Sequence, residues 1–101
     1  MASYALAYYG EPQFSSQEDG AKYQEKWKAW EASVGDALGA LTPLHPAKKV
    51  STDSISDNGG ENRLSGFCMV TADSLDAAIE MAQSCPHLEY GTIDVSEVWE
   101  M

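Results

Sequence analysis

Basic residues are scarce in this sequence, and they are absent from its last third. The 101 residues include 6 lysines and arginines against 16 aspartates and glutamates, so the formal net charge is −10. No lysine or arginine follows Arg63. Such a surface repels the phosphates of nucleic acids and of anionic lipids, so we expect neither nucleic acid nor a membrane as a partner. The same acidity also keeps a small protein soluble.

Cysteine and histidine are equally sparse. The chain has 2 cysteines, Cys68 and Cys85, and 2 histidines, His45 and His87, at spacings that match no metal site. Two cysteines without further ligand residues nearby indicate reduced thiols and not a disulfide framework. We therefore expect a protein that binds no metal and needs no cofactor.

Targeting and catalytic motifs are lacking as well. The first nine residues have no positive flank and are followed by Gly10 and Pro12, which predicts neither a secretory signal nor a membrane span and favours a cytoplasmic protein. No Gly-x-Ser-x-Gly sequence occurs, so hydrolase chemistry has no support. Gly59-Gly60 is too short for a phosphate-binding loop and precedes a strand pattern instead of a helix.

The most regular pattern lies in the last third of the chain. A helix is predicted there, because apolar residues recur at helical spacing after a capping residue, Asp73 or Ser74, until Cys85-Pro86 ends the pattern. The period then changes to two, which predicts a closing strand. The apolar face of that strand carries Ile93, Val95, Trp99 and Met101.

The first half predicts a strand and a long helix. Residues 4–9 are almost wholly apolar or aromatic, which fits a strand that is covered on both faces. Ser15-Ser16 and the acidic residues after them resemble a capping box. The apolar stripe of the helix that follows consists of Tyr23, Trp27, Trp30, Val34 and Leu38.

The middle of the chain is less regular. Pro43 and Pro46 oppose regular pairing, so we expect only a short edge strand, at residues 49–52. Residues 57–62 are rich in Asp, Asn and Gly, which predicts the loop of a hairpin. Residues 64–72 then form the third strand, and both of its faces are largely apolar.

Together these elements predict one α+β domain over residues 1–101. The order strand, helix, strand, strand, helix, strand is the ferredoxin-like βαββαβ arrangement with a four-stranded antiparallel sheet. Two helices cover only one face of such a sheet. The apolar residues on both faces of the first and third strands therefore predict a homodimer in which two sheets pack face to face.

Short segments, in order along nearly the whole chain, point to a known family. The strongest are residues 72–78 (ADSLDAA), 85–88 (CPHL) and 91–95 (GTIDV). Others precede them at residues 4–10, 26–30, 49–51 and 64–67. As an ordered set they resemble the YCII-related (DGPF-type) domain family. The resemblance implies a small cytoplasmic dimeric α+β barrel, in a family without an established general activity.

The sequence departs from that family where some members carry a proposed functional pair. Those members have a histidine on the first helix and an aspartate nearby, whereas no histidine occurs here between Ser15 and Leu41. Cys85 stands where some members have an acidic residue before the proline of the second helix, and residues 55–60 lack the Asp-Gly-Pro-Phe tetrapeptide. The resemblance therefore does not carry this pair over to the chain.

Two polar residues remain as candidates for chemistry. His87, in the loop before the last strand, can act as an acid, a base or a hydrogen-bond donor near neutral pH, or it can simply bond the backbone. Glu97 is unusual because strand alternation places it in the apolar row. There it can bind a polar ligand group or accept a proton, with the pKa of its carboxyl raised by burial. Alternatively, a bulge turns it to solvent, or it pairs with Lys48, Lys49 or Arg63.

The aromatic residues complete the candidate site, because they either line an apolar pocket or simply form the core. The leading hypothesis is a binding protein that holds a small organic molecule with Tyr8, Trp27, His87 and Glu97. An alternative is an enzyme that performs acid/base chemistry on a small cyclic or carbonyl compound, with His87 or Glu97 as the base. A third is a structural or protein-interaction module that uses the acidic last third as its contact surface.

Overall fold

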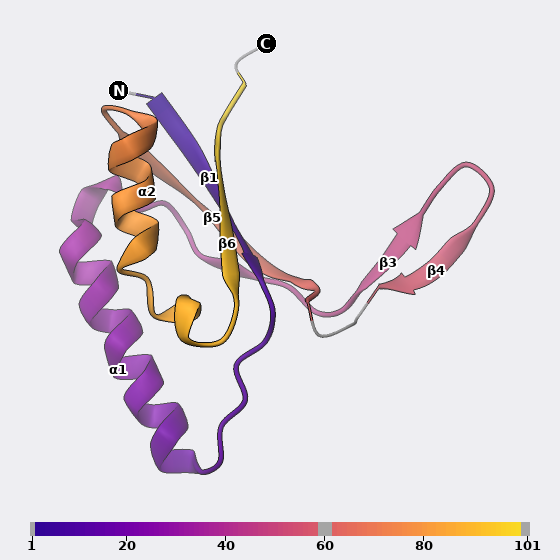
Figure 1. The fold of residues 1–101 in the computed structure, drawn as a ribbon, viewed down its shortest axis with the longest axis horizontal. Helices are drawn as coiled ribbons and strands as arrows, with labels where there is room; N and C mark the ends of the chain where they lie inside the picture. The colour runs from indigo at the N-terminus through magenta and orange to yellow at the C-terminus, as the bar shows by residue number, and fades with distance from the viewer. Residues whose placement is uncertain (1, 59–61, 100–101) are drawn as a thin grey trace.

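The computed structural model describes residues 2–58 and 62–99, which form a four-stranded antiparallel sheet with two helices on one side (Figure 1). The sheet has the order β2-β5-β1-β6 and contains β1 (Ala2–Tyr9), β2 (Thr42–Pro43), β5 (Leu64–Ala72) and β6 (Thr92–Glu97). The helices are α1 (Gln17–Val34) and α2 (Leu75–Gln83), followed by the short turns η1 (Gly35–Ala37) and η2 (Pro86–Glu89). The predicted ferredoxin-like α+β class is confirmed.

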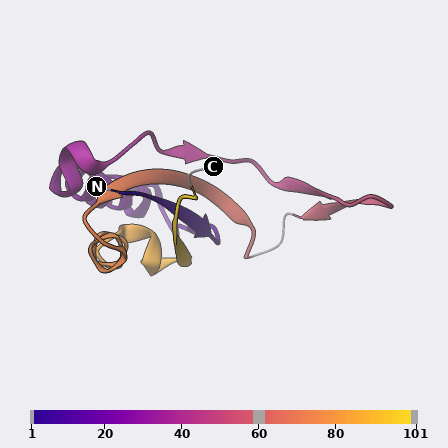
Figure 2. The same cartoon turned by 90° about the horizontal axis from the view of Figure 1, so that it is seen from above.

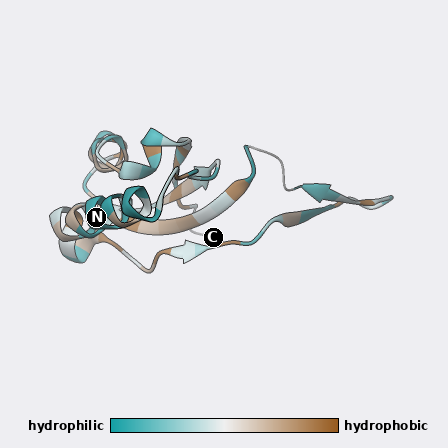
Figure 3. Ribbon diagram, turned by 90° about the horizontal axis from the view of Figure 1, so that it is seen from below, coloured by the Kyte–Doolittle hydropathy of each residue, from teal (hydrophilic) through white to brown (hydrophobic). Residues whose placement is uncertain are grey.

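The core lies between the helices and alternate residues of the two central strands. Tyr4, Leu6 and Tyr8 of β1 are buried, and so are Cys68 and Val70 of β5. Most of β5 is coloured white to brown in Figure 3, which marks residues of intermediate to high hydropathy. On the opposite face of the same strands, Ala5, Ala7, Phe67 and Met69 are partly or fully exposed. The described part of the chain therefore covers one of the two apolar faces expected from the sequence and leaves the other open.

Both helices begin at the predicted capping serines. The Ser16 hydroxyl accepts a hydrogen bond from the Asp19 amide at 3.2 Å, and the Ser74 hydroxyl accepts one from Ala77 at 3.2 Å. The first helix ends earlier than its apolar stripe suggests, because Gly35 adopts a φ of 66°, a conformation that favours glycine and stops the helix. Leu38, expected on the helix, instead forms a bridge with Val70 of β5.

The middle of the chain differs most from the prediction. The edge strand of the sheet is β2, which includes Pro43, and not residues 49–52. Pro43 is tolerated because an edge strand has one side without a partner in the sheet, where no N–H is required. Close approach is possible because Gly66 lies opposite, where a Cβ atom would come within 2.9 Å of the Thr42 carbonyl oxygen.

Residues 47–58 form a separate hairpin, which we call the arm. Its strands β3 (Ala47–Val50) and β4 (Ile55–Asn58) pair only with each other in the described sheets, and the turn between them lies at residues 51–54. The loop predicted at 57–62 is therefore wrong for Asp57 and Asn58, which belong to β4, while residues 59–61 lie outside the described residues. Figure 2 shows the arm extending away from the sheet and helices.

The last strand is shorter than predicted. β6 ends at Glu97, and Trp99 lies beyond it with 83% of its surface exposed, so it is not part of the apolar row. Met101 lies outside the described residues. No helix in the described part of the chain is long and apolar enough to cross a membrane.

An irregularity in the β1–β5 pairing shapes the end of the sheet. The register shifts after Tyr8, so that Tyr8 lies opposite Gly66 and Tyr9 lies opposite Leu64. The Ser65 hydroxyl donates a hydrogen bond to the Tyr8 carbonyl oxygen at 3.1 Å. Bulges of this kind redirect the side chains next to them, and this one lies beside the cavity described below.

Candidate functional site

A cavity of about 630 Å³ opens between α1, the irregular end of the sheet and the segment that carries β2. Three of the predicted site residues, Tyr8, Trp27 and His87, line it. Arg63 and Glu11 contribute charged groups to the same cavity. Its volume and its mixture of aromatic and polar walls suit a small organic molecule.

Trp27 forms the aromatic wall of the cavity together with Tyr8 and Tyr23. The ring centroids of Trp27 and Tyr8 lie 5.7 Å apart, and those of Trp27 and Tyr23 lie 6.2 Å apart, both with the rings at 79°. Edge-to-face contacts of this kind are favourable between aromatic rings. Tyr8 and Tyr23 are buried and Trp27 is partly buried, so the same residues form core and cavity wall.

The groups behind the aromatic wall stay protonated near neutral pH. The Tyr8 hydroxyl lies 3.0 Å from Cys68 Sγ, and burial raises the pKa of Tyr8 above its ordinary value. Burial also raises the pKa of Cys68, and it raises the pKa of Cys85 to about 11. Both cysteines are free thiols, as predicted. They contribute shape and hydrogen bonds but no thiolate nucleophile.

His87 is buried at the floor of the cavity, with 3% of its surface exposed. Its Nε2 lies 2.8 Å from the Tyr9 carbonyl oxygen. Because a carbonyl only accepts hydrogen bonds, Nε2 must carry the proton of the neutral ring, which leaves the lone pair on Nδ1. No hydrogen bond within residues 2–58 and 62–99 reaches Nδ1. His87 can therefore serve the structure and still take part in chemistry. Its Nε2 bonds the backbone, and its Nδ1 keeps a lone pair that can accept a proton.

Gly91 allows His87 to reach the backbone of β1. A Cβ atom at position 91 would lie 2.0 Å from the Tyr9 carbonyl oxygen and 2.8 Å from His87 Nε2. Both distances are shorter than any van der Waals contact, so no larger residue fits without movement of the backbone. The hydrogen bond of His87 therefore depends on a glycine four residues later.

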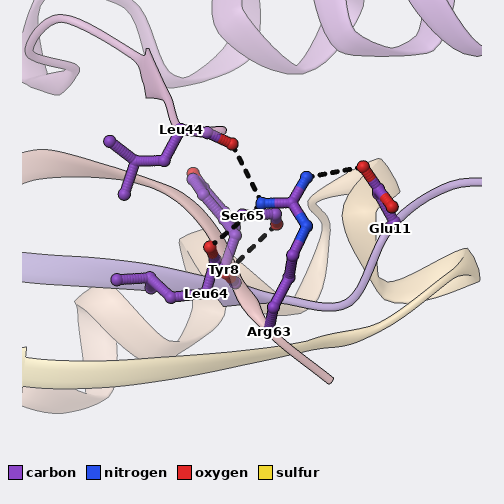
Figure 4. A network of polar contacts seen from close by, with 6 residues as sticks. All are labelled: Tyr8, Glu11, Leu44, Arg63, Leu64 and Ser65. Atoms are coloured by element: carbon purple, nitrogen blue, oxygen red, sulfur yellow. Dashed lines mark hydrogen bonds and ion pairs between the residues drawn. The ribbon is translucent and has the colours of Figure 1, made fainter. Parts of the chain in front are cut away.

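Arg63 is a buried charged group of the cavity that the sequence pattern does not reveal as a site residue (Figure 4). The sequence offers it only as an ion-pair partner of Glu97, because a residue just before a strand gives no periodic signal of burial. Its Nη1 donates to the carbonyl oxygens of Leu44 at 2.9 Å and Leu64 at 3.3 Å, and its Nη2 donates to Glu11 at 2.5 Å. The guanidinium thus ties β5 to the segment after β2 and places a positive charge at the cavity.

Glu97 does not line this cavity. Its register partner is Tyr4, four residues along β1 from Tyr8, and its Oε1 accepts a hydrogen bond from the Tyr4 hydroxyl at 3.4 Å. The strand alternation that placed Glu97 on the helix-facing side is correct, but the residue lies at the exposed end of β6. The predicted group of four therefore separates into three cavity residues and one distant carboxylate.

A second hollow is a weaker candidate for a site. It has a volume of about 580 Å³ and lies between α1 and η2. Its charged residues, Lys26 and Glu89, are exposed and form an ion pair with each other at 2.9 Å. Among the described residues, no group of three or more histidine, cysteine, aspartate or glutamate side chains could hold a metal ion. The polar groups of the first cavity, Arg63 and His87, are in contrast buried.

Comparison with known proteins places the chain in a family. Residues 2–101 match the YCII-related domain. The chain belongs to the YCII-related family. Comparison of this YCII-related protein with curated proteins found no match.

A solved structure has a fold similar to that of this YCII-related protein. It is 5-chloro-2-hydroxyhydroquinone dehydrochlorinase (TftG) from Burkholderia phenoliruptrix AC1100, in complex with 2,5-dihydroxybenzoquinone. The TM-score is 0.60 at 14% sequence identity, and the match covers 97% of this chain and 93% of the other. At this identity the likeness concerns the fold alone.

The first helix of this YCII-related protein has no histidine, and it contributes aromatic and polar side chains to the cavity instead. Tyr23, Gln24, Trp27 and Glu31 of α1 line the cavity. The buried polar groups come instead from η2, which carries His87, and from Arg63, directly before β5. Any chemistry in this cavity therefore depends on residues other than the first-helix histidine and nearby aspartate that some family members carry.

Proposed function

We propose that this YCII-related protein binds a small planar organic molecule in the cavity beside Trp27. The observation that carries the proposal is the combination, in one cavity of about 630 Å³, of an aromatic wall with the buried polar groups of Arg63 and His87. Aromatic faces supply contact area to a planar ligand, and a few fixed polar groups orient it.

The ligand class to test first is a hydroxylated or quinonoid ring. The dehydrochlorinase of similar fold is described in complex with 2,5-dihydroxybenzoquinone, and we take this compound as the first probe. Native mass spectrometry of freshly purified protein adds an unbiased search, because one spectrum reports the subunit number and any small molecule carried along.

Matched tryptophan variants test the cavity by calorimetry. We expect Trp27→Ala to weaken ring binding at least tenfold, because it removes the aromatic wall. Trp99→Ala should leave binding unchanged, since Trp99 is 83% exposed and does not line the cavity. Glu97→Gln should likewise have no effect. Equal losses in Trp27→Ala and Trp99→Ala, or none in either, would contradict the proposal.

A second candidate function is proton transfer by an enzyme, and the tautomer of His87 favours it. The Tyr9 carbonyl oxygen holds the proton on Nε2, so Nδ1 is the ring nitrogen with a lone pair that can accept a proton. His87→Gln can keep the bond to Tyr9 through its amide while it removes the base. An enzyme would lose turnover at least a hundredfold in this variant, whereas a binding protein would show no product with either form.

We further propose a homodimer in which the open sheet faces pack together. Support comes from Phe67 and Met69, which are 40% and 36% exposed on the face opposite the helices. Met69→Glu should give a monomeric mass under dilute, near-neutral conditions, whereas Leu75→Glu, on α2, should leave the dimer intact. A monomeric mass for the unaltered protein would remove the proposal. We also propose a cytoplasmic location, which the two free thiols support.

A further inference from the structure

We infer that the ligand of this cavity carries a carboxylate, which binds the edge of the Arg63 guanidinium formed by Nε and Nη2. The inference rests on the proposed binding function and names the chemical class of the ligand. It requires Glu11 to give up its place on that edge when the ligand binds.

Among the described residues, the hydrogen bonds of Arg63 are incomplete on the edge formed by Nε and Nη2. Nη1 is satisfied by the Leu44 and Leu64 carbonyl oxygens (Figure 4). Nη2 has one acceptor, Glu11, while Nε is buried and has no hydrogen-bond partner in the described part of the chain. The N–H bonds of Nε and Nη2 point to the same side of the planar group, which is the geometry that a carboxylate accepts with two oxygens. A buried charged donor without an acceptor is unfavourable, so a second oxygen at this edge would stabilise the site.

The two members of the ion pair differ in their freedom to move. The Arg63 side chain is 6% exposed, whereas the Glu11 side chain is 58% exposed, and both residues line the cavity. Glu11 can therefore rotate into water at little cost, while Arg63 is held by two backbone carbonyl oxygens. Replacement of one carboxylate by another also leaves the charge around the guanidinium unchanged.

The charge of the protein favours a carboxylate over a phosphate. A single guanidinium balances one negative charge, whereas a doubly charged phosphate would meet Glu11 and Glu31 at the same cavity and a protein of net charge −10. The aromatic wall then holds the apolar part of the same molecule. We therefore expect an aromatic or other planar carboxylic acid, with the ring toward Trp27 and the carboxylate toward Arg63.

A pair of isosteric probes tests the inference by calorimetry at neutral pH. The probes are 2-naphthoate, which is ionised, and 2-naphthamide, which is neutral and of the same shape. We expect the unaltered protein to bind naphthoate about tenfold more tightly than naphthamide, which corresponds to one charge-assisted hydrogen bond. Arg63→Met should abolish this preference, so that the two probes bind with similar affinity.

Two variants keep the test decisive if Arg63→Met fails to fold. Glu11→Gln removes the competing carboxylate, so it should strengthen naphthoate binding severalfold relative to naphthamide binding. Lys22→Gln makes the same charge change as Arg63→Met on an exposed part of α1 and should leave the preference intact. An unchanged or weaker naphthoate affinity in Glu11→Gln, or an equal loss of preference in Lys22→Gln, would overturn the inference.

The two proposals fail in different ways. If the unaltered protein binds both probes equally, the carboxylate site is wrong and the aromatic cavity stands. If it binds neither probe, the carboxylate site is wrong, and the proposed function fails with it when 2,5-dihydroxybenzoquinone does not bind either.

Discussion

Single residues decide whether the candidate site can form at all. His87 keeps its position through one hydrogen bond to the Tyr9 carbonyl oxygen, and Gly91 makes room for that bond. A Cβ atom at position 91 therefore forces the backbone near both groups to move. Gly20, in contrast, lies on α1, where a Cβ atom would make an ordinary 3.5 Å contact with Phe14.

Alanine substitutions at these two glycines should change the free energy of unfolding in opposite directions. We expect Gly91→Ala to lower the free energy of unfolding by about 2–3 kcal/mol, because β1 and η2 must separate. Gly20→Ala should raise it by about 0.5–1 kcal/mol, since alanine favours helix over glycine. Urea unfolding followed by tryptophan fluorescence measures both. A neutral Gly91→Ala variant would show that the approach of His87 to Tyr9 is not tight in solution.

The raised pKa of Cys85 predicts a loss of stability in alkali. Burial raises the pKa of this thiol from 9.0 to about 11. The unfolded chain then loses the proton at lower pH than the folded protein, so the stabilising contribution is complete below pH 9 and is lost as the pH rises toward 11. Between pH 8 and pH 10.5, the unaltered protein should lose about 1–2 kcal/mol more than Cys85→Ala. Parallel losses in urea titrations of the two proteins would contradict this.

At the scale of elements, local signals predicted most of the fold. The helix after Ser74 and the strand from Leu64 to Ala72 were correct because a capping serine, a proline stop and a buried apolar run all act over a few residues. The ferredoxin-like class followed from the order of these elements along the chain.

The elements that could not be predicted depend on distant contacts. Pro43 belongs to the sheet because Gly66, far along the chain, lets the backbone approach. Lys49 and Val50 pair with β4 instead of with the sheet, and nothing in their alternation distinguishes the two partners. Tyr8, Trp27 and His87 were predicted as site residues from the chemistry of their side chains, and they line the cavity. The burial of Arg63 could not be predicted, because it depends on the distant Leu44 carbonyl group, which no local pattern reveals.

The cap of α2 offers a test at this scale. Ser74→Ala removes the acceptor of the Ala77 amide and should lower the free energy of unfolding by about 1 kcal/mol. Ser74→Asn keeps an acceptor at the cap and should cost only a few tenths of that amount. Thermal or urea unfolding of the three proteins compares them directly. If asparagine proved as damaging as alanine, the cap would not be the reason for the loss.

The whole molecule is a thin body with an arm beside it. Its extents are 45 × 42 × 18 Å, and every residue of β3 and β4 is exposed. Val50 and Ile55 form an apolar pair on the arm although they are 71% and 72% exposed. The arm therefore adds little buried area to the chain that carries it.

Unfolding experiments on the isolated chain should show that substitutions on the arm cost less stability than substitutions in the core. Val50→Thr combined with Ile55→Thr should change the free energy of unfolding by less than about 0.5 kcal/mol, because both side chains are already exposed. Val70→Thr, at a position that is 1% exposed, should lower it by about 1–3 kcal/mol, because it buries a hydroxyl in the core. A large loss in the double variant would mean that the arm is covered in solution.

Because Arg63 is buried, the rate of trypsin cleavage after this residue reports on local opening of the structure. Trypsin must draw an arginine or lysine side chain into its specificity pocket, and no such residue follows Arg63. The folded protein should therefore resist cleavage after Arg63 until the guanidinium leaves the Leu44 and Leu64 carbonyl groups. The rate of this single cut then measures how often that end of the cavity opens, and a bound carboxylate should slow it in proportion to its occupancy.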